Sequence, residues 1–301
     1  MSKTTIKSWI IAARLRTLPL AFSSILVGSV LAWNDGATDL RVVGLTLLTA
    51  ILLQILSNFA NDYGDAVSGV DSDQRKGPDR MVQSGAITKA AMRNALIVSS
   101  VLTLISGILL LFLAFPDNWQ LMLIFFGVGL LAIAASIKYT VGKNPYGYAG
   151  FGDVFVFVFF GLVAVAGTYF LQTKSFEWNI LLPAASLGFF AVGVLNVNNI
   201  RDIETDLASG KYSIPVRIGR EKAGIYHALL ISAGLLTSIV FVLLNYGHAF
   251  QLAFILLGGL FLKNIRAVQS KTGHELDPHL KQMAIATLLF SAVFSVGQFF
   301  G

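Results

Sequence analysis

Two clusters of aspartate and asparagine stand where long apolar stretches of the chain end. The first cluster consists of Asn58, Asn61, Asp62 and Asp65, with Asp71 behind it, and the second of Asn196, Asn198, Asn199, Asp202 and Asp206. Carboxylates this close together repel one another and are costly to desolvate near a membrane unless a cation lies between them. Magnesium prefers oxygen ligands, takes one or two carboxylates, and completes its shell with water and phosphate oxygens. The clusters therefore predict a magnesium site that also holds phosphate.

Helical spacing would place each cluster on one face of a helix end, because residues at i, i+3, i+4 and i+7 lie on the same side. This rule groups Asn58 with Asp62 and Asp65, and Asn199 with Asp202 and Asp206. For one cluster alone, the alternative is a solvated loop rich in turn-forming residues. Two clusters with the same layout favour two opposed acidic faces.

Basic residues follow both clusters. They are Arg75, Lys76 and Arg80 after the first, Lys211, Arg217 and Arg220 after the second, and Lys138 and Lys143 between the two. Magnesium bridging the phosphates, with Lys and Arg neutralising the remaining charge, makes diphosphate a better leaving group. For any single basic residue, the alternative is the excess of Lys and Arg that cytoplasmic loops carry.

The composition indicates that an all-α polytopic membrane protein positions these residues. Of 301 residues, 55% are hydrophobic and 13% charged, and the mean hydropathy is +0.72. A membrane-spanning helix needs about 20 apolar residues, and charged residues divide the chain at similar intervals. These intervals are Arg16 to Asp35, Arg41 to Asp62, Arg93 to Asp117, Asp117 to Lys138, Asp153 to Lys174, Glu177 to Arg201, two spans between Lys222 and Lys263 split at Asn245 to His248, and one beyond Lys281. We expect about nine spans in one domain, residues 1–301, with the shortest apolar stretch, Ala249 to Leu262, in the eighth.

The distribution of Lys and Arg predicts the orientation. With the N-terminus in the cytoplasm and the C-terminus outside, all of the 22 basic residues except Arg41 and Lys174 fall on the cytoplasmic side, as cytoplasmic loops require. The cytoplasmic loops would then be about 62–94, 138–152 and 201–224. Both acidic clusters border these loops, so the site is expected to face the cytoplasm.

Several other functions are disfavoured. Topology and attraction to anionic lipid account for the net charge of +6 without a nucleic-acid partner. The chain has no cysteine, and its four histidines lack zinc-binding spacing. A divalent-cation transporter is the rival from a different class, but transport predicts carboxylates near the bilayer midplane. A phosphatidyl-group transferase would carry a DGxxAR-type motif, which is not found.

Three longer strings resemble the UbiA superfamily of intramembrane aromatic prenyltransferases. They are Leu15-Arg16-Thr17-Leu18-Pro19-Leu20-Ala21-Phe22, Asn61-Asp62-Tyr63-Gly64-Asp65, and Tyr139 to Tyr148, with Asp202 to Asp206 as a second acidic motif. Within the superfamily they are most similar to the branch that prenylates 1,4-dihydroxy-2-naphthoate in menaquinone biosynthesis. The first motif of the superfamily reads NDxxDxxxD, whereas this chain has Gly69 at the last position and its next acid at Asp71.

The resemblance implies a nine-helix bundle that binds prenyl diphosphate with Mg²⁺ and acts on an aromatic acid in the cytoplasmic membrane of a bacterium. The implied roles are metal binding by Asp62, Asp65 and Asp71 and by Asp202 and Asp206; orientation of these carboxylates by Asn58, Asn61 and Asn199; diphosphate binding by Tyr139, Lys143, Lys211 and Arg80; and binding of the acceptor carboxylate by Arg16, Arg80 or Arg201. The allylic diphosphate would ionise, and the acceptor ring would attack the carbocation with loss of carbon dioxide. Acceptors of the 4-hydroxybenzoate or homogentisate type remain alternatives.

The run Phe155, Phe157, Phe159 and Phe160 has two interpretations. The rings would line the prenyl groove and shield the cation, or face lipid as filler. Alternation at every second residue cannot place all of them on one helical face, which favours the second interpretation.

Overall fold

The computed structural model describes residues 5–68 and 80–300, and the described residues are helical with connecting turns and no strand. Nine helical segments within them are long and apolar enough to cross a membrane, which confirms the predicted number. In chain order these are α1–η1–α2 (Ile6–Asn34), α3 (Leu40–Ser68), α4 (Lys89–Ala114), α5 (Trp119–Lys138), α6–η2–α7 (Gly152–Thr173), η3–α8 (Trp178–Arg201), α11 (Arg220–Leu244), η4–α12 (Ala249–Ser270) and η5–α13 (Gly273–Phe299). Two short helices, α9 (Ile203–Ala208) and α10 (Ile214–Ile218), connect α8 to α11.

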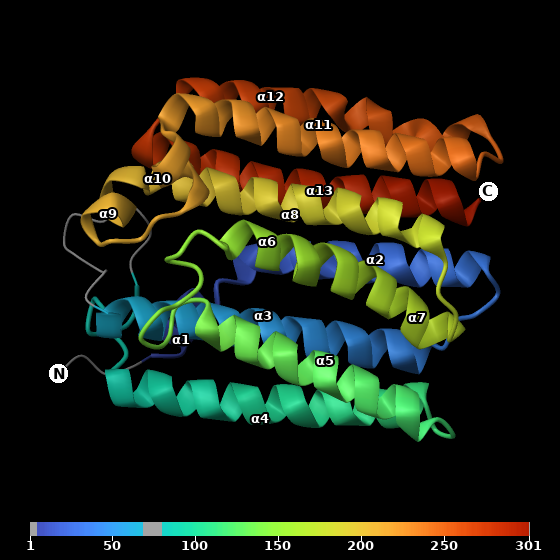
Figure 1. Ribbon diagram of the computed structural model, residues 1–301, viewed down its shortest axis with the longest axis horizontal. Helices are drawn as coiled ribbons and strands as arrows, with labels where there is room; N and C mark the ends of the chain where they lie inside the picture. The colour runs from blue at the N-terminus through green and yellow to red at the C-terminus, as the bar shows by residue number, and fades with distance from the viewer. Residues whose placement is uncertain (1–4, 69–79, 301) are drawn as a thin grey trace.

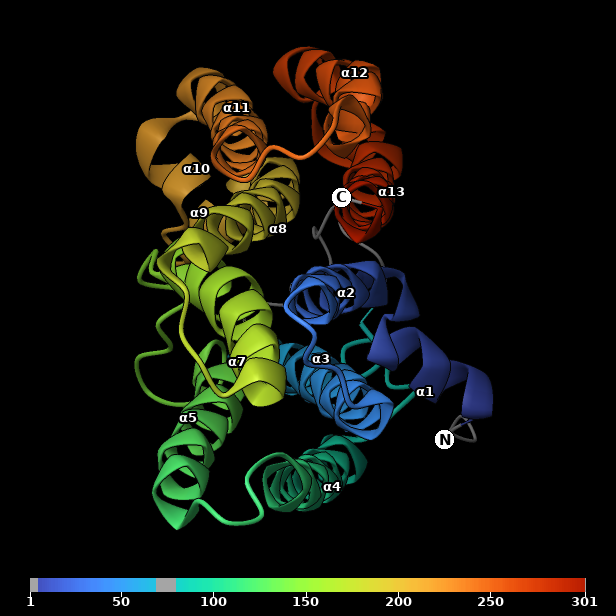
Figure 2. The same cartoon turned by 90° about the vertical axis from the view of Figure 1, so that its right-hand side faces the viewer.

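The helices lie side by side along the long axis of the molecule (Figure 1). Seen from the end, α2 and α3 occupy the middle, with α4 and α5 on one side and α8, α11, α12 and α13 on the other (Figure 2). The first described helix begins and α13 ends at opposite ends of the bundle, as an odd number of spans requires. The C-terminal ends of α3 and α8 lie at the same end of the bundle, where α9 also lies, so both acidic clusters are brought to this end (Figure 1).

The first span is interrupted before it becomes straight. α1 (Ile6–Ala13) ends at Arg14, whose φ of 49° is left-handed, and a short 3-10 turn, η1 (Leu15–Thr17), leads into α2 (Leu18–Asn34). Pro19 stands in the first turn of α2, where the missing N–H has no helical partner to lose. The interruption turns Arg14 and Arg16 toward the interior cavity.

The eighth span has few apolar residues for a membrane-spanning segment, but part of it is a 3-10 helix, which is longer per residue than an α-helix. η4 covers Ala249–Leu257 and α12 covers Gly258–Ser270. A 3-10 helix rises about 2.0 Å per residue against about 1.5 Å in an α-helix, so nine residues cover about 18 Å rather than about 14 Å. The short apolar stretch is therefore sufficient.

The fifth span contains a π-helical segment, η2 (Phe157–Ala166), between α6 (Gly152–Val156) and α7 (Gly167–Thr173). It packs closely on α8 (Leu181–Arg201). A Cβ on Gly161 would lie 2.6 Å from Ala184 O, and one on Gly188 would lie 2.7 Å from the Phe157 ring. Because glycine has no Cβ, η2 and α8 can pack this closely. The packing fixes η2 with Phe159 and Phe160 on the side of the cavity.

Candidate active site

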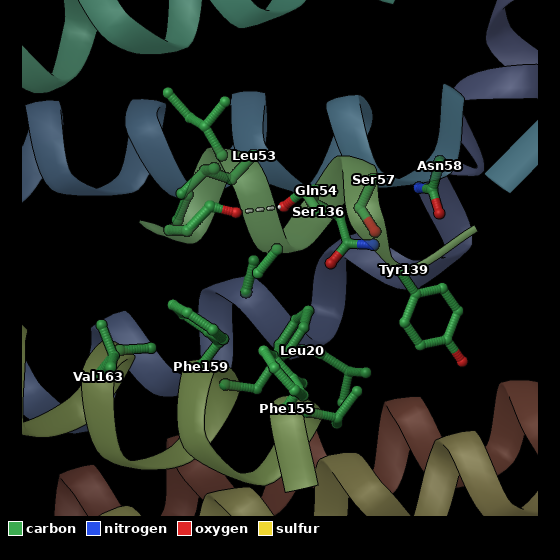
Figure 3. Close-up of a pocket in the computed structure, with 18 of the residues that line it drawn as sticks. Leu20, Leu53, Gln54, Ser57, Asn58, Ser136, Tyr139, Phe155, Phe159 and Val163 are labelled. Carbon is green, nitrogen blue, oxygen red and sulfur yellow. Dashed lines mark hydrogen bonds between the residues drawn. The ribbon is translucent and has the colours of Figure 1, made fainter. Parts of the chain in front are cut away.

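A cavity of about 410 Å³ lies between α2, α3, α4, α5, the η2 span and α8. Its polar end lies where α3 and α8 end, and its other end is lined by apolar side chains of α4 and α5. Figure 3 shows Gln54, Ser57 and Asn58 of α3 on one wall, with Phe155 and Phe159 on the facing wall. One cavity thus joins an acidic and basic end to a long apolar chamber.

The cavity separates the predicted site residues into two groups. Those that line it are Arg16, Asn58, Asn61, Asp65, Arg80, Tyr139, Asp202, Asp206 and Lys211. Those that do not are Asp62, Lys143, Asn199 and Arg201, while Asp71 lies outside the described residues. The prediction that the two acidic clusters share one site is consistent with the first group.

Asp62 differs from the predicted face. The residues of α3 that line the cavity include Gln54, Asn58, Asn61 and Asp65, and at 100° per residue Asp62 points about 70° away from their mean direction. Its carboxylate instead accepts hydrogen bonds from the backbone N–H groups of Met81, at 3.0 Å, and Val82, at 3.2 Å. Asp62 thereby holds the segment that carries Arg80. Asn61, and not Asp62, occupies the position in the cavity wall that was expected for Asp62.

The partners that hold Asp65 include Tyr148 and Arg80. Tyr148 donates its hydroxyl proton to Oδ1 at 2.5 Å, and Arg80 forms an ion pair with Oδ2. Arg80 also donates to the Asn61 carbonyl oxygen, and burial together with Asp65 raises the pKa of Tyr148, so its hydroxyl stays a donor. Tyr148 is the last residue of the Tyr139 to Tyr148 string, and its contact with Asp65 indicates its role.

Close contact between α3 and the loop after α5 brings Tyr139 into the same site. A Cβ on Gly64 would lie 2.6 Å from the Thr140 carbonyl oxygen, and Thr140 Oγ1 donates to Ala60 O at 2.9 Å. Burial, followed by the field of nearby carboxylates, raises the pKa of Tyr139. Lys143, three residues further along the loop than Thr140, is exposed and outside the cavity.

Asp202, at the end of α8, is neutralised by its neighbour. Arg201 donates from Nε to Oδ1 at 2.8 Å and from Nη2 to Oδ2 at 2.7 Å. The same guanidinium binds Asp277 of α13 (Asp277–Phe299) at 2.8 Å and Asn198 Oδ1 at 2.8 Å. Because its side chain is 2% exposed and its donors are engaged, Arg201 is a poor acceptor-binding residue, which corrects that expectation.

Asp206, on α9, pairs with Lys211. Lys211 Nζ donates to Oδ1 at 3.2 Å and lies 3.0 Å from Oδ2. The approach to Oδ2 is not aligned as a hydrogen bond, so this buried oxygen keeps open lone pairs. Burial raises the pKa of Asp206, and Lys211 opposes that shift.

Two asparagines do not orient carboxylates as expected. Asn58 Nδ2 donates to Ala13 O at 2.8 Å and to Thr17 Oγ1 at 3.1 Å, which ties α3 to the interrupted first span. Asn199 is buried beside the cavity wall, and its Oδ1 has no partner among the described residues. The spacing rule identified the helix face but could not identify the groups with which the asparagine side chains form hydrogen bonds.

The donor set suits a divalent metal that arrives with phosphate. Within the described residues, no three His, Asp or Glu side chains converge closely enough to hold an ion by themselves. Asp65, Asp202 and Asp206 nevertheless line one cavity, and Asp206 Oδ2 accepts no hydrogen bond from the described residues although Lys211 lies beside it. Oxygen ligands from few carboxylates, completed by phosphate oxygens, are what Mg²⁺ takes. Arg80 and Lys211 stand next to these carboxylates and can neutralise the phosphate.

Aromatic rings lead from the polar end into the chamber. Tyr139 meets Tyr146 edge-on at 5.4 Å between ring centroids, Tyr146 stacks on Phe155 at 3.9 Å, and Phe155 lies 6.2 Å from Phe159. Phe155, Phe159 and Phe160 line the cavity, so the lipid-filler interpretation is wrong for these three. Phe157 alone turns away, toward Phe189 on α8; the wide π-helical turn of η2 brings Phe159 and Phe160 together on the cavity side.

Comparison with known proteins agrees with this architecture. A family model described as "UbiA prenyltransferase family" matches residues 21–289. The 1,4-dihydroxy-2-naphthoate octaprenyltransferases of Haemophilus influenzae and Escherichia coli are 43% and 42% identical to this chain; the alignments cover 100% and 97% of it and 98% and 95% of those proteins. A solved UbiA homolog from Archaeoglobus fulgidus bound to GPP and Mg2+ has a TM-score of 0.62 at 17% identity, over 96% of this chain and 100% of that one.

Proposed function

The chain belongs to the UbiA prenyltransferase family, and from that premise we propose that it transfers a polyprenyl group from prenyl diphosphate to 1,4-dihydroxy-2-naphthoate, with decarboxylation. The relatives that carry this name are similar over nearly the full length of both chains. The observation that carries the proposal is the single cavity in which carboxylates of α3, α8 and α9 meet Arg80 and Lys211 at the mouth of an apolar chamber. Such a chamber suits a prenyl chain, and its polar end suits a diphosphate.

Asp65, Asp202 and Asp206 would hold magnesium, with Asp71 as a further candidate. Bound there, the metal would supply charge stabilisation for the departing diphosphate. Arg80, Lys211 and the Tyr139 hydroxyl would contact the phosphate oxygens, since all three line the polar end. Asp62 would act through the backbone of Met81 and Val82, and so position Arg80.

The remaining residues of the cavity would exclude water and orient the acceptor. Tyr146, Phe155 and Phe159 present ring faces or edges along the path of the allylic carbon, and aromatic faces attract developing positive charge. Arg16, supported by Arg14, would bind the acceptor carboxylate, because both line the cavity. A dry, positioned pair of reactants requires no nucleophilic side chain.

Two further proposals concern placement in the cell. We propose that the protein lies in the cytoplasmic membrane of a bacterium with the N-terminus and the cavity mouth on the cytoplasmic side. The distribution of Lys and Arg supports this orientation. The carboxylates lie at helix ends beside basic side chains, an arrangement that opposes passage of cations and disfavours the transporter alternative.

The test is prenyl transfer by the purified protein, with octaprenyl diphosphate and Mg²⁺, followed by the mass of the lipid product. The naphthoate, 4-hydroxybenzoate and homogentisate are offered in parallel, with and without EDTA. We expect product from the naphthoate that is lost with EDTA. Product only from another acceptor would move the assignment to that acceptor, and product from none would refute prenyl transfer to these acids.

A further inference from the structure

The side-chain oxygen of Gln54, in the cavity wall, has no hydrogen-bond partner among the described residues. Gln54 of α3 is 8% exposed and lines the cavity, and among the described residues no donor reaches its Oε1. Figure 3 shows its side chain extending from α3 toward the middle of the cavity, across from Leu20 and Phe155. Buried amide oxygens are normally hydrogen-bonded, so this one is available to a ligand.

Thr17 determines which way the Gln54 amide faces. The Thr17 hydroxyl donates its single proton to the Arg14 carbonyl oxygen at 2.9 Å. Its oxygen can then only accept, and it does so from Gln54 Nε2 and from Asn58 Nδ2, each at 3.1 Å. Turning the Gln54 amide over would set two oxygens against each other without a proton between them. The nitrogen is therefore held on Thr17, and Oε1 on the side of the cavity.

The surroundings of Gln54 fit an aromatic acid that also carries a hydroxyl group. Arg14 and Arg16, on the interrupted first span that Thr17 belongs to, line the same cavity. Phe155 and Phe159 form the facing wall. A flat ring placed between these walls would have cationic groups for a carboxylate and, at Gln54, an acceptor for a hydroxyl proton.

The separation from the acidic end is compatible with this placement. Gln54 precedes Asp65 by eleven residues of α3, which corresponds to about 16 Å along the helix at about 1.5 Å per residue. This distance leaves room for a metal-bound diphosphate next to Asp65 and for a bicyclic ring beyond the reacting carbon.

On the basis of the proposed function, we propose that Gln54 Oε1 accepts a hydrogen bond from a ring hydroxyl of the acceptor and thereby selects hydroxylated aromatic acids. A buried group built to bond a substrate hydroxyl discriminates strongly against an analogue without it, because the group is then left unpaired. Gln54 is a specificity-determining residue, and Thr17 positions it.

The experiment measures equilibrium binding of three acids to the purified protein without prenyl diphosphate: 1,4-dihydroxy-2-naphthoate, 1-hydroxy-2-naphthoate and 4-hydroxy-2-naphthoate. Gln54→Leu should weaken binding of the dihydroxy acid about tenfold, which corresponds to about 1.4 kcal/mol. It should change binding of the analogue that lacks the contacted hydroxyl less than about twofold. Thr17→Val, which keeps Gln54 but frees its amide, should give a smaller loss for the same acids.

Gln282→Leu is the matched control, because it makes the same change on α13, where Gln282 contacts Asn264 and His279 outside the cavity. It should leave the affinities of all three acids unchanged. Equal weakening of all three acids by Gln54→Leu, or no weakening, would overturn the inference and leave the proposed function intact if the wild-type protein still transfers a prenyl group. Failure of the wild-type protein to prenylate the naphthoate would overturn both.

Discussion

Replacing Asp65 by Asn should separate the catalytic role of this carboxylate from its structural one. Asp65 and Arg80 form a buried ion pair whose side chains are 6% and 8% exposed. Asn keeps an acceptor for Tyr148 but removes the negative charge that pairs with Arg80 at Oδ2. Removing one partner of a buried ion pair destabilises a fold by about 3 to 5 kcal/mol. Because Arg80 would keep its hydrogen bond to the Asn61 carbonyl oxygen, we expect a value at the lower end, about 3 kcal/mol.

The double variant Asp65→Asn with Arg80→Met tests this reasoning. It removes both charges, so unfolding in detergent should return most of the way toward the wild-type temperature. Prenyl transfer should fall at least about 100-fold in both variants, the size of effect found when a single group that stabilises charge in a transition state is removed. Transfer by Asp65→Asn within about threefold of wild type at saturating Mg²⁺ would refute the assignment, and equal stability of the single and double variants would refute the buried-pair argument.

Three further predictions concern pH, packing and topology. Burial raises the pKa of Asp206, so protons compete with metal as the pH falls through the raised value. The Mg²⁺ concentration needed for half-maximal transfer should therefore increase as the pH falls. Lys211→Met removes the cation that lowers the pKa of Asp206, so in this variant the increase should begin at a higher pH. An Mg²⁺ requirement that stays constant as the pH is lowered to the point where the protein begins to unfold would contradict this. Gly64→Ala should destabilise the protein by about 1 to 3 kcal/mol through overpacking in thermal unfolding, since its Cβ would lie 2.6 Å from backbone, whereas Gly44→Ala on the same helix, with open space around it, should not. Lys143→Cys, the single cysteine of that variant, should react with an impermeant thiol reagent only after cells are opened, and labelling of intact cells would invert the proposed orientation.

The sign of the Asp206 effect on stability is opposite to that of a salt-bridged surface carboxylate. A carboxyl group with a raised folded pKa contributes stability that is present at low pH and is lost as the pH rises through that value. Metal binding requires the ionised form, so Mg²⁺ should stabilise the protein more at neutral pH than at a pH below the raised pKa of Asp206. Unfolding temperatures with and without Mg²⁺ at several pH values measure both trends.

Helical periodicity predicted the right helix ends but not the right side chains on them. Asn58, Asp62 and Asp65 satisfy the spacing rule, yet the cavity lies on the side of Asn61, and Asp62 caps the backbone at Met81 and Val82. A spacing rule defines a face about 100° wide, and the tertiary contacts of α3 decide which half of that face meets the cavity. The sequence carries no local signal for that choice.

The roles of the arginines were equally open from sequence. Arg16 and Arg201 both stand at span ends and both suit a carboxylate, but Arg201 is engaged by Asp202, Asp277 and Asn198. Asp277 is 76 residues away in the chain, so no local pattern could exclude Arg201. The role of Gln54 could not be read from the sequence either, because there it is one polar residue in an apolar helix. Its amide is oriented by Thr17, which belongs to another span.

What the sequence determined by itself was the all-helical membrane architecture, the nine spans and the end of the bundle where the acidic clusters lie. These follow from the bilayer, which requires runs of apolar residues of a set length and places charges at their ends. The tertiary structure decided which carboxylates share the cavity, which cations neutralise them, and which rings face the chamber. The physical reason is that these choices depend on contacts between helices that are distant in the chain, where close packing and hydrogen-bond direction allow one arrangement.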